Sequence, residues 1–178
     1  MKALRTIRLD ASDTIVFEHA AQPGEWAVSG AFVFASVDPS RLKGKARAAF
    51  RSGFLGIDTL GWSTLVQIVE ATETERARAV DTLAERLVEH FGAPSLAIAR
   101  VAAEEEIDFA VALADQPSGM LAAVSRTTEG GSIRESFRSL QPAANRPARA
   151  YAFLHTSGED EEPAEEIDLA SLAKRVPR

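Results

Sequence analysis

Two strand-like segments around a pair of glycines constrain this chain more than any other feature of its sequence. Residues 120–128 and 132–140 are rich in side chains that favour strands, and Gly130-Gly131 between them is typical of a two-residue hairpin turn. If the residues that flank the turn face each other, compatible side chains meet on each face of the hairpin. The predicted pairs are Glu129 with Ser132, Val124 with Phe137, Arg126 with Glu135, Thr128 with Ile133, Ser125 with Ser136, and Thr127 with Arg134. The sequence therefore predicts an antiparallel strand pair in a defined register.

Further strands are predicted in the first part of the chain. Residues 4–9, 14–19 and 26–35 have compositions that favour strands, and the last of these is apolar on both faces, which is typical of the middle of a sheet. Residues 62–69 form another apolar run of the same kind. Because predicted strands mostly follow one another along the chain, we expect a largely antiparallel sheet.

The clearest predicted helix begins at Thr72. Glu75 completes a capping box with Thr72, an apolar stripe follows at helical spacing, and Gly92 ends it. A shorter helix is predicted after the start signal Asp38-Pro39-Ser40. A third is predicted over 104–114, where three glutamates at its start would complement the helix dipole.

These elements predict an α+β fold. We expect a largely antiparallel sheet of about five to six strands with two to three helices packed mainly on one face. Residues 1–140 are predicted to form the domain, and 141–178 a linker and acidic C-terminal tail. Within this tail, 151–155 is expected to add a strand or to dock on the core, and 167–176 to form a short docking helix.

The charges are distributed unevenly along the chain. The formal net charge is −6, but residues 1–53 and 119–150 each carry +3, whereas 54–118 carry −8 and 151–178 carry −4. A basic face and an acidic face within one domain are one interpretation, and separately solvated helix faces are the other. The basic residues within 43–51 are interpreted as a solvated face, because they lack the aromatic neighbours of a nucleic-acid platform.

Several kinds of chemistry have no sequence signal. The chain has no cysteine, which excludes disulfides, thiolate metal sites and cysteine nucleophiles. His19, His90 and His155 lack the spacing of metal-ligand motifs, and no phosphate-binding glycine loop or serine nucleophile motif is present. We therefore predict no catalytic residue, metal or cofactor. With neither a secretory signal nor an apolar run of membrane-spanning length, the cytoplasm is the expected location.

Five residues are the candidates for ligand binding. Trp26 and Trp62 open apolar segments beside glycine-containing turns, so their rings could line one pocket, although a core position is the alternative. Arg134, Ser136 and Arg138 share one predicted strand face, which could hold an anionic ligand or could simply be an exposed sheet face.

Four segments resemble a family of small bacterial proteins of unknown function. They are Leu4–Asp10, Gly24–Gly30, Phe54–Gly56 and Gly61–Leu65. The resemblance extends over residues 1 to about 140 and implies no activity for any residue. It carries one association, in that genes of this family tend to lie near accessory genes of molybdenum-dependent oxidoreductases.

Two functional hypotheses follow. The first is a non-catalytic accessory or protein-interaction domain that binds a protein partner or forms a homodimer. The alternative is a small-molecule-binding domain, or an enzyme, that acts on an anionic metabolite, so whether the chain is an enzyme stays open. Binding to nucleic acid or to a membrane is not expected from the net charge and the hydropathy.

Overall fold

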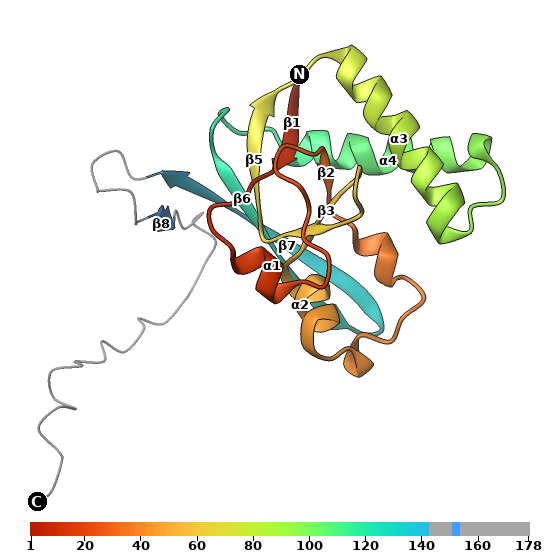
Figure 1. Cartoon of the computed structure of the whole chain (residues 1–178), viewed down its shortest axis with the longest axis horizontal. Helices are drawn as coiled ribbons and strands as arrows, with labels where there is room; N and C mark the ends of the chain where they lie inside the picture. Colours follow the sequence, from red (N-terminus) through yellow and green to blue (C-terminus); the bar gives the residue numbers. More distant parts are fainter. Residues whose placement is uncertain (143–150, 154–178) are drawn as a thin grey trace, which may run out of the picture.

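The computed structural model of the chain describes residues 1–142 and 151–153 (Figure 1). The strands are β1 (Lys2–Thr6), β2 (Ala27–Val28), β3 (Phe54–Gly56), β4 (Trp62–Ser63), β5 (Leu65–Glu70), β6 (Leu121–Glu129), β7 (Ser132–Pro142) and β8 (Tyr151–Phe153). The α-helices are α1 (Ser12–Val16), α2 (Gly44–Ser52), α3 (Glu73–Phe91) and α4 (Leu96–Leu113), and the 3-10 helices are η1 (Ala31–Phe34) and η2 (Pro39–Arg41).

The strands form two antiparallel sheets. The larger has the order β1-β5-β6-β7-β8, and the smaller has the order β2-β3-β4. Helices α3 and α4 pack against each other, and Ile107 of α4 is buried in one cluster with Leu4 and Ile68 of the larger sheet. Ser136 and Arg138 lie on the opposite face of that sheet and are exposed. The predicted α+β class, with a largely antiparallel sheet, is confirmed.

The predicted hairpin is confirmed in full. Strands β6 and β7 pair from Leu121 with Leu140 to Glu129 with Ser132, and the intervening pairs are those expected from the sequence. Gly130 and Gly131 have φ angles of 58° and 84°, a backbone conformation that side chains with a Cβ rarely adopt. The turn chemistry and the alternating faces therefore agree, which is why this register could be predicted from local sequence.

The predicted boundaries of α3 are also confirmed. Thr72 accepts from the backbone N–H of Glu75 and the Glu75 carboxylate accepts from the backbone N–H of Thr72, so both halves of the capping box are present. The helix ends at Gly92, which has a φ of 72°. The buried residues of α3 follow the predicted apolar stripe.

Two predicted strands in the first part of the chain are wrong. Residues 14–19 overlap α1 instead, because only Phe17 reaches the core while Ile15 is 71% exposed. The segment 26–35 keeps strand pairing only in β2. It then turns at Gly30, whose φ is 76°, and continues as the 3-10 helix η1.

Three predicted boundaries also change. The run 62–69 is divided between β4 and β5, because Thr64 between them bonds through its hydroxyl and backbone N–H to the buried carboxylate of Asp13. The helix predicted over 104–114 begins earlier, with Ser95 as its N-cap, so the three glutamates lie in mid-helix. The Asp38 start signal caps only η2, and α2 follows separately.

The C-terminal predictions are tested only in part. Of the two alternatives for 151–155, the structure takes the added strand, since Phe153 of β8 pairs with Leu140 of β7. The linker segment from 143 to 150 and the helix expected over 167–176 lie outside the described residues. The division at residue 140 stays a prediction.

Candidate functional site

The two tryptophans contribute to the core. Trp26 is 4% exposed, and the Arg5 guanidinium lies 5.3 Å from the centre of its ring. Trp62 packs against both buried clusters of the protein, and its ring lies 5.4 Å from that of Phe34. Strand β3 separates the two segments, and neither ring lines either of the two cavities described below. Ligand binding by the two tryptophans therefore stays a prediction.

The three candidates on β7 share an exposed face. Arg134, Ser136 and Arg138 alternate with residues that face the core. Arg134 is engaged in an ion pair, with its Nε 2.5 Å from Oε2 of Glu129. The structure thus brings these three side chains to one surface, away from both tryptophans and from both cavities. Ligand binding there stays a prediction.

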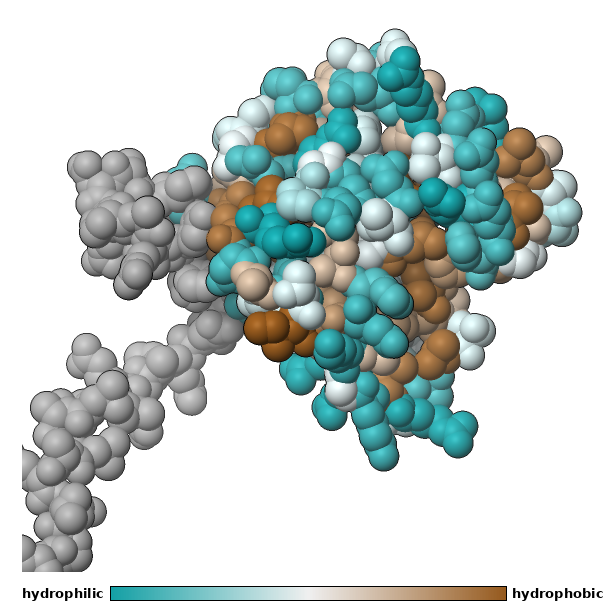
Figure 2. Space-filling view, viewed as in Figure 1, coloured by the Kyte–Doolittle hydropathy of each residue, from teal (hydrophilic) through white to brown (hydrophobic). Residues whose placement is uncertain are grey.

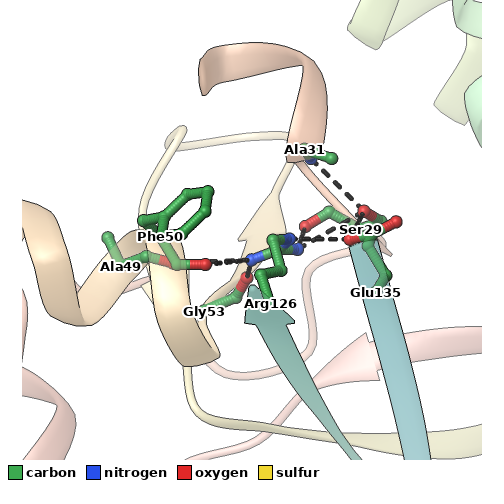
Figure 3. Close-up of polar contacts among 7 residues, drawn as sticks. All are labelled: Ser29, Ala31, Ala49, Phe50, Gly53, Arg126 and Glu135. Atoms are coloured by element: carbon green, nitrogen blue, oxygen red, sulfur yellow. Dashed lines mark hydrogen bonds and ion pairs between the residues drawn. The ribbon is translucent and has the colours of Figure 1, made fainter. Parts of the chain in front are cut away.

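A buried arginine forms the most extensive polar network in the described residues (Figure 3). The side chain of Arg126 is fully buried and bonds through Nε to Glu135 at 2.6 Å. Its Nη1 donates to the backbone carbonyls of Phe50 at 3.1 Å and Gly53 at 2.7 Å, and its Nη2 donates to the Ser29 carbonyl. The guanidinium therefore joins β6, β7, the end of α2 and the residue after β2.

Glu106 of α4 lies close enough to this network to be affected by its charges. Burial, followed by the charge of Glu135, raises the pKa of Glu106 to about 7, whereas Arg126 opposes the rise. Burial also lowers the pKa of the Arg126 guanidinium, and Glu135 offsets part of that effect. Glu106 is therefore the carboxyl group in this region that changes protonation near neutral pH.

Two further buried carboxylates are structural. Asp13 accepts from the hydroxyl of Thr64, beside a cavity of about 210 Å³ between α1 and the start of β5. Glu25 accepts from the backbone N–H groups of Asp58 and Thr59 at 3.0 and 2.9 Å, and from the Thr59 hydroxyl at 2.6 Å. Burial, together with the Glu25 charge, raises the pKa of Asp58. Both oxygens of each carboxylate accept hydrogen bonds from the loops that they join, so both groups have a structural role.

A second cavity of about 360 Å³ lies where α2 and η2 meet β6. Arg47 and Arg51 of α2 lie on one wall, and Thr127 and Thr128 come from β6, where Thr128 shares the strand face of Arg126. Arg126 also contributes to the wall, although its side chain is fully buried. This cavity therefore combines exposed cations with hydroxyl groups.

The outer face of α4 is apolar and exposed. Ile98, Val101 and Phe109 are 57%, 59% and 42% exposed, and they recur at helical spacing. They lie opposite the buried Ala103 and Ile107. Val88, Phe91 and Leu96, near the connection between α3 and α4, are also exposed apolar residues. Figure 2 shows apolar surface at that end of the molecule. In an isolated chain this apolar face is therefore exposed to solvent.

Sequence reasoning missed this face because the helix was predicted to begin at Glu104. The true start of this helix is indicated by Ser95. A serine that follows the breakers Gly92 and Pro94 and directly precedes an apolar run is a typical helix N-cap. It also missed the cavity, because the basic positions of α2 and the threonines of β6 are distant in sequence.

The fold and these surfaces define an α+β domain with an exposed apolar helix face and a basic cavity. The chain belongs to a family of unknown function (DUF6505), whose model matches residues 1–158. The match continues past residue 140 and includes β8. No curated protein and no solved structure matches the chain. Among the described residues, no helix has the length and hydropathy needed to cross a membrane.

Proposed function

We propose that this protein is a non-catalytic interaction domain, of an accessory kind, that binds a partner protein through the outer face of α4. The observation that carries the proposal is the exposure of Ile98, Val101 and Phe109 along a single face of one helix. Single exposed apolar residues are ordinary, but several large ones on one side of a helix are typical of a binding surface. From Ile98 to Ala112 the face is about 20 Å long, which matches several turns of a partner helix.

The polar edge of this face is well ordered. Arg100 of α4 lies 2.9 Å from Asp81 of α3, and Arg76 of α3 pairs with Asp108 of α4. Both ion pairs lie on the side of α4 that contacts α3, so the two helices are held in one orientation. The apolar face is therefore presented on a fixed support, which lowers the entropic cost of binding.

The charges around the face indicate the chemistry of the partner. Glu105 lies on the apolar face itself and Glu104 beside it, and both are exposed. The segment 54–118, which contains both helices, carries −8. A partner segment that complements this surface has an apolar stripe flanked by lysine or arginine residues.

A second copy of the chain fits this surface less well. The face runs from Ile98 to Ala112, so Glu105 lies at its midpoint. In a two-fold arrangement of antiparallel helices, the residue at the midpoint meets its own copy. Two Glu105 carboxylates would then face each other across an apolar interface, which is unfavourable. The charge pattern therefore favours a different, basic partner over a homodimer.

The test is affinity capture at near-native expression, with matched variants of the chain. The double variant Ile98→Asp with Val101→Asp places charges on the apolar face, while Arg78→Asp places a charge on an exposed position of α3. We expect a partner that the wild type and the α3 variant retain and that the α4 variant loses. Components of molybdenum-dependent oxidoreductase systems are the first proteins to look for.

Two results would overturn the proposal. One is the absence of any partner for the wild type, and the other is a partner retained equally by the α4 variant. Because both substituted side chains are more than half exposed, the variants are expected to unfold at the same urea concentration as the wild type. Sedimentation of the purified chain separates the homodimer alternative, since a dimer broken by the α4 variant would identify a second copy as the occupant.

A further inference from the structure

The cavity between α2, η2 and β6 has the composition of an anion site. Arg47 and Arg51 are four residues apart on α2, so their side chains project from the same side of the helix. Both are exposed, and neither forms an ion pair with any other described residue. Two guanidinium groups with uncommitted donors therefore border one cavity of about 360 Å³.

The remaining polar groups of the cavity add donors and one opposing charge. Thr128 contributes a hydroxyl group from the strand face that also carries Arg126. Asp38 also lines the cavity, but its carboxylate Oδ1 accepts from the backbone N–H of Ser40 at 3.0 Å and from the Ser40 hydroxyl at 2.7 Å. Asp38 therefore acts as the cap of η2, and two arginines against one carboxylate leave the cavity net basic.

Arg126 fixes the position of α2 relative to β6, and so fixes the shape of the cavity between them. Arg126 bonds to the carbonyls of Phe50 and Gly53 at the end of α2, and so ties this helix to β6. The Arg126 guanidinium is itself committed to Glu135 and to backbone carbonyls, so it does not serve as a ligand donor. Its role here is positioning: its bonds to Phe50 and Gly53 (Figure 3) attach the end of α2, the helix of Arg47 and Arg51, to β6.

A second observation, from charge distribution, indicates the same location. Residues 1–53, which contain α2, carry a net charge of +3, and residues 119–142, which contain β6 and β7, carry +1. The fold brings them together at this cavity although they are far apart in sequence. The acidic stretch 54–118 contains α3 and α4, where the apolar face lies.

We infer that this cavity binds a small oxyanion ligand, a molecule that carries phosphate or carboxylate groups. Arg47 and Arg51 donate charge-assisted hydrogen bonds to the anionic oxygens, and Thr128, on the strand face of Arg126, donates its hydroxyl. The cavity volume of about 360 Å³ fits a small metabolite. The inference is independent of the proposed partner surface, because it rests on different elements and different residues.

The experiment is an amide NMR titration of the full chain with inorganic pyrophosphate, and in a second arm with citrate. We expect chemical-shift changes confined to α2, η2 and the end of β6. Arg47→Gln and Arg51→Gln should each weaken binding by at least about tenfold, because each removes a charge-assisted hydrogen bond. Asp38→Asn should strengthen binding, because it removes the opposing charge. The two arms distinguish a phosphate ligand from a carboxylate ligand.

The controls are Arg78→Gln on α3 and Arg138→Gln on the exposed face of β7. Both should bind like the wild type. An absence of shifts with either anion, or binding unaffected by both α2 variants, would overturn the inference. So would loss of binding in Arg138→Gln alone, since the anion would then bind on the exposed strand face. Because Arg47 and Arg51 are exposed, equal urea midpoints for all variants would show that lost binding is not lost folding.

Discussion

Arg126 and Glu135 face each other across β6 and β7, and Nε of the arginine lies 2.6 Å from Oε1 of the glutamate. Ser29 donates to the same carboxylate oxygen at 2.5 Å, so the ion pair is hydrogen-bonded to both sheets of the protein. It is the point at which the larger sheet, the smaller sheet and α2 meet. Its energetic role is therefore larger than that of a surface ion pair.

Replacing this arginine is expected to destabilise the protein strongly. Arg126→Met leaves Glu135 without its partner and removes the donors to the α2 carbonyls, so we expect a loss of about 3–5 kcal/mol in the free energy of unfolding. Urea unfolding followed by circular dichroism measures it. The double variant Arg126→Met with Glu135→Leu should recover part of that loss, because no unpaired charge stays buried. A change below about 1 kcal/mol in the single variant would contradict the account.

A second prediction concerns the pH dependence of stability. Because the pKa of Glu106 is raised from 4.5 to about 7 in the folded protein, the folded state holds this proton more tightly than the unfolded state. Stability is therefore expected to fall as the pH rises from about 5 to about 8, as Glu106 ionises beside Glu135. Glu106→Gln removes that contribution, so its urea midpoint should fall less over the same range. Parallel pH profiles for the two proteins would show that Glu106 does not titrate there.

A third prediction concerns the loop around Glu25. Its buried carboxylate accepts from Asp58 and Thr59, and Glu25→Ala removes these hydrogen bonds and leaves a gap in the core. We expect a loss of about 3 kcal/mol or more in the free energy of unfolding, compared with less than about 0.5 kcal/mol for Glu18→Ala, which is exposed and makes no side-chain hydrogen bond among the described residues. Similar midpoints for the two variants would contradict a structural role for Glu25.

The elements predicted correctly are those whose signals lie within the element or directly beside it in the sequence. The hairpin register followed from two glycines and the alternation of β6 and β7, and the limits of α3 followed from its capping box and Gly92. Segment 26–35 could not be predicted in this way. Its chain direction depends on Gly30, where a Cβ would lie 2.7 Å from the Cβ of Leu55. That contact exists only once β3 is in place.

The candidate sites show the same limit. Arg126 was predicted to pair with Glu135, but its bonds to Phe50 and Gly53 join residues 76 and 73 positions apart. Long-range contacts of this kind leave no periodic pattern in the sequence. The predicted ligand residues were chosen from side-chain type alone, so tryptophans of the core were grouped with arginines of an exposed strand face. The apolar face of α4 emerged only when the start of the helix was known.

The most direct test of the proposed interaction surface uses the absence of cysteine from the chain. Val101→Cys and Arg78→Cys each give a single thiol, on the outer face of α4 and on exposed α3 respectively, to which a benzophenone maleimide can be attached. When each purified, labelled variant is added to lysate and illuminated, the α4 probe should crosslink to one partner through a segment of apolar and basic residues, while the α3 probe gives no such product. Equal crosslinking from both positions, or none from position 101, would contradict the account.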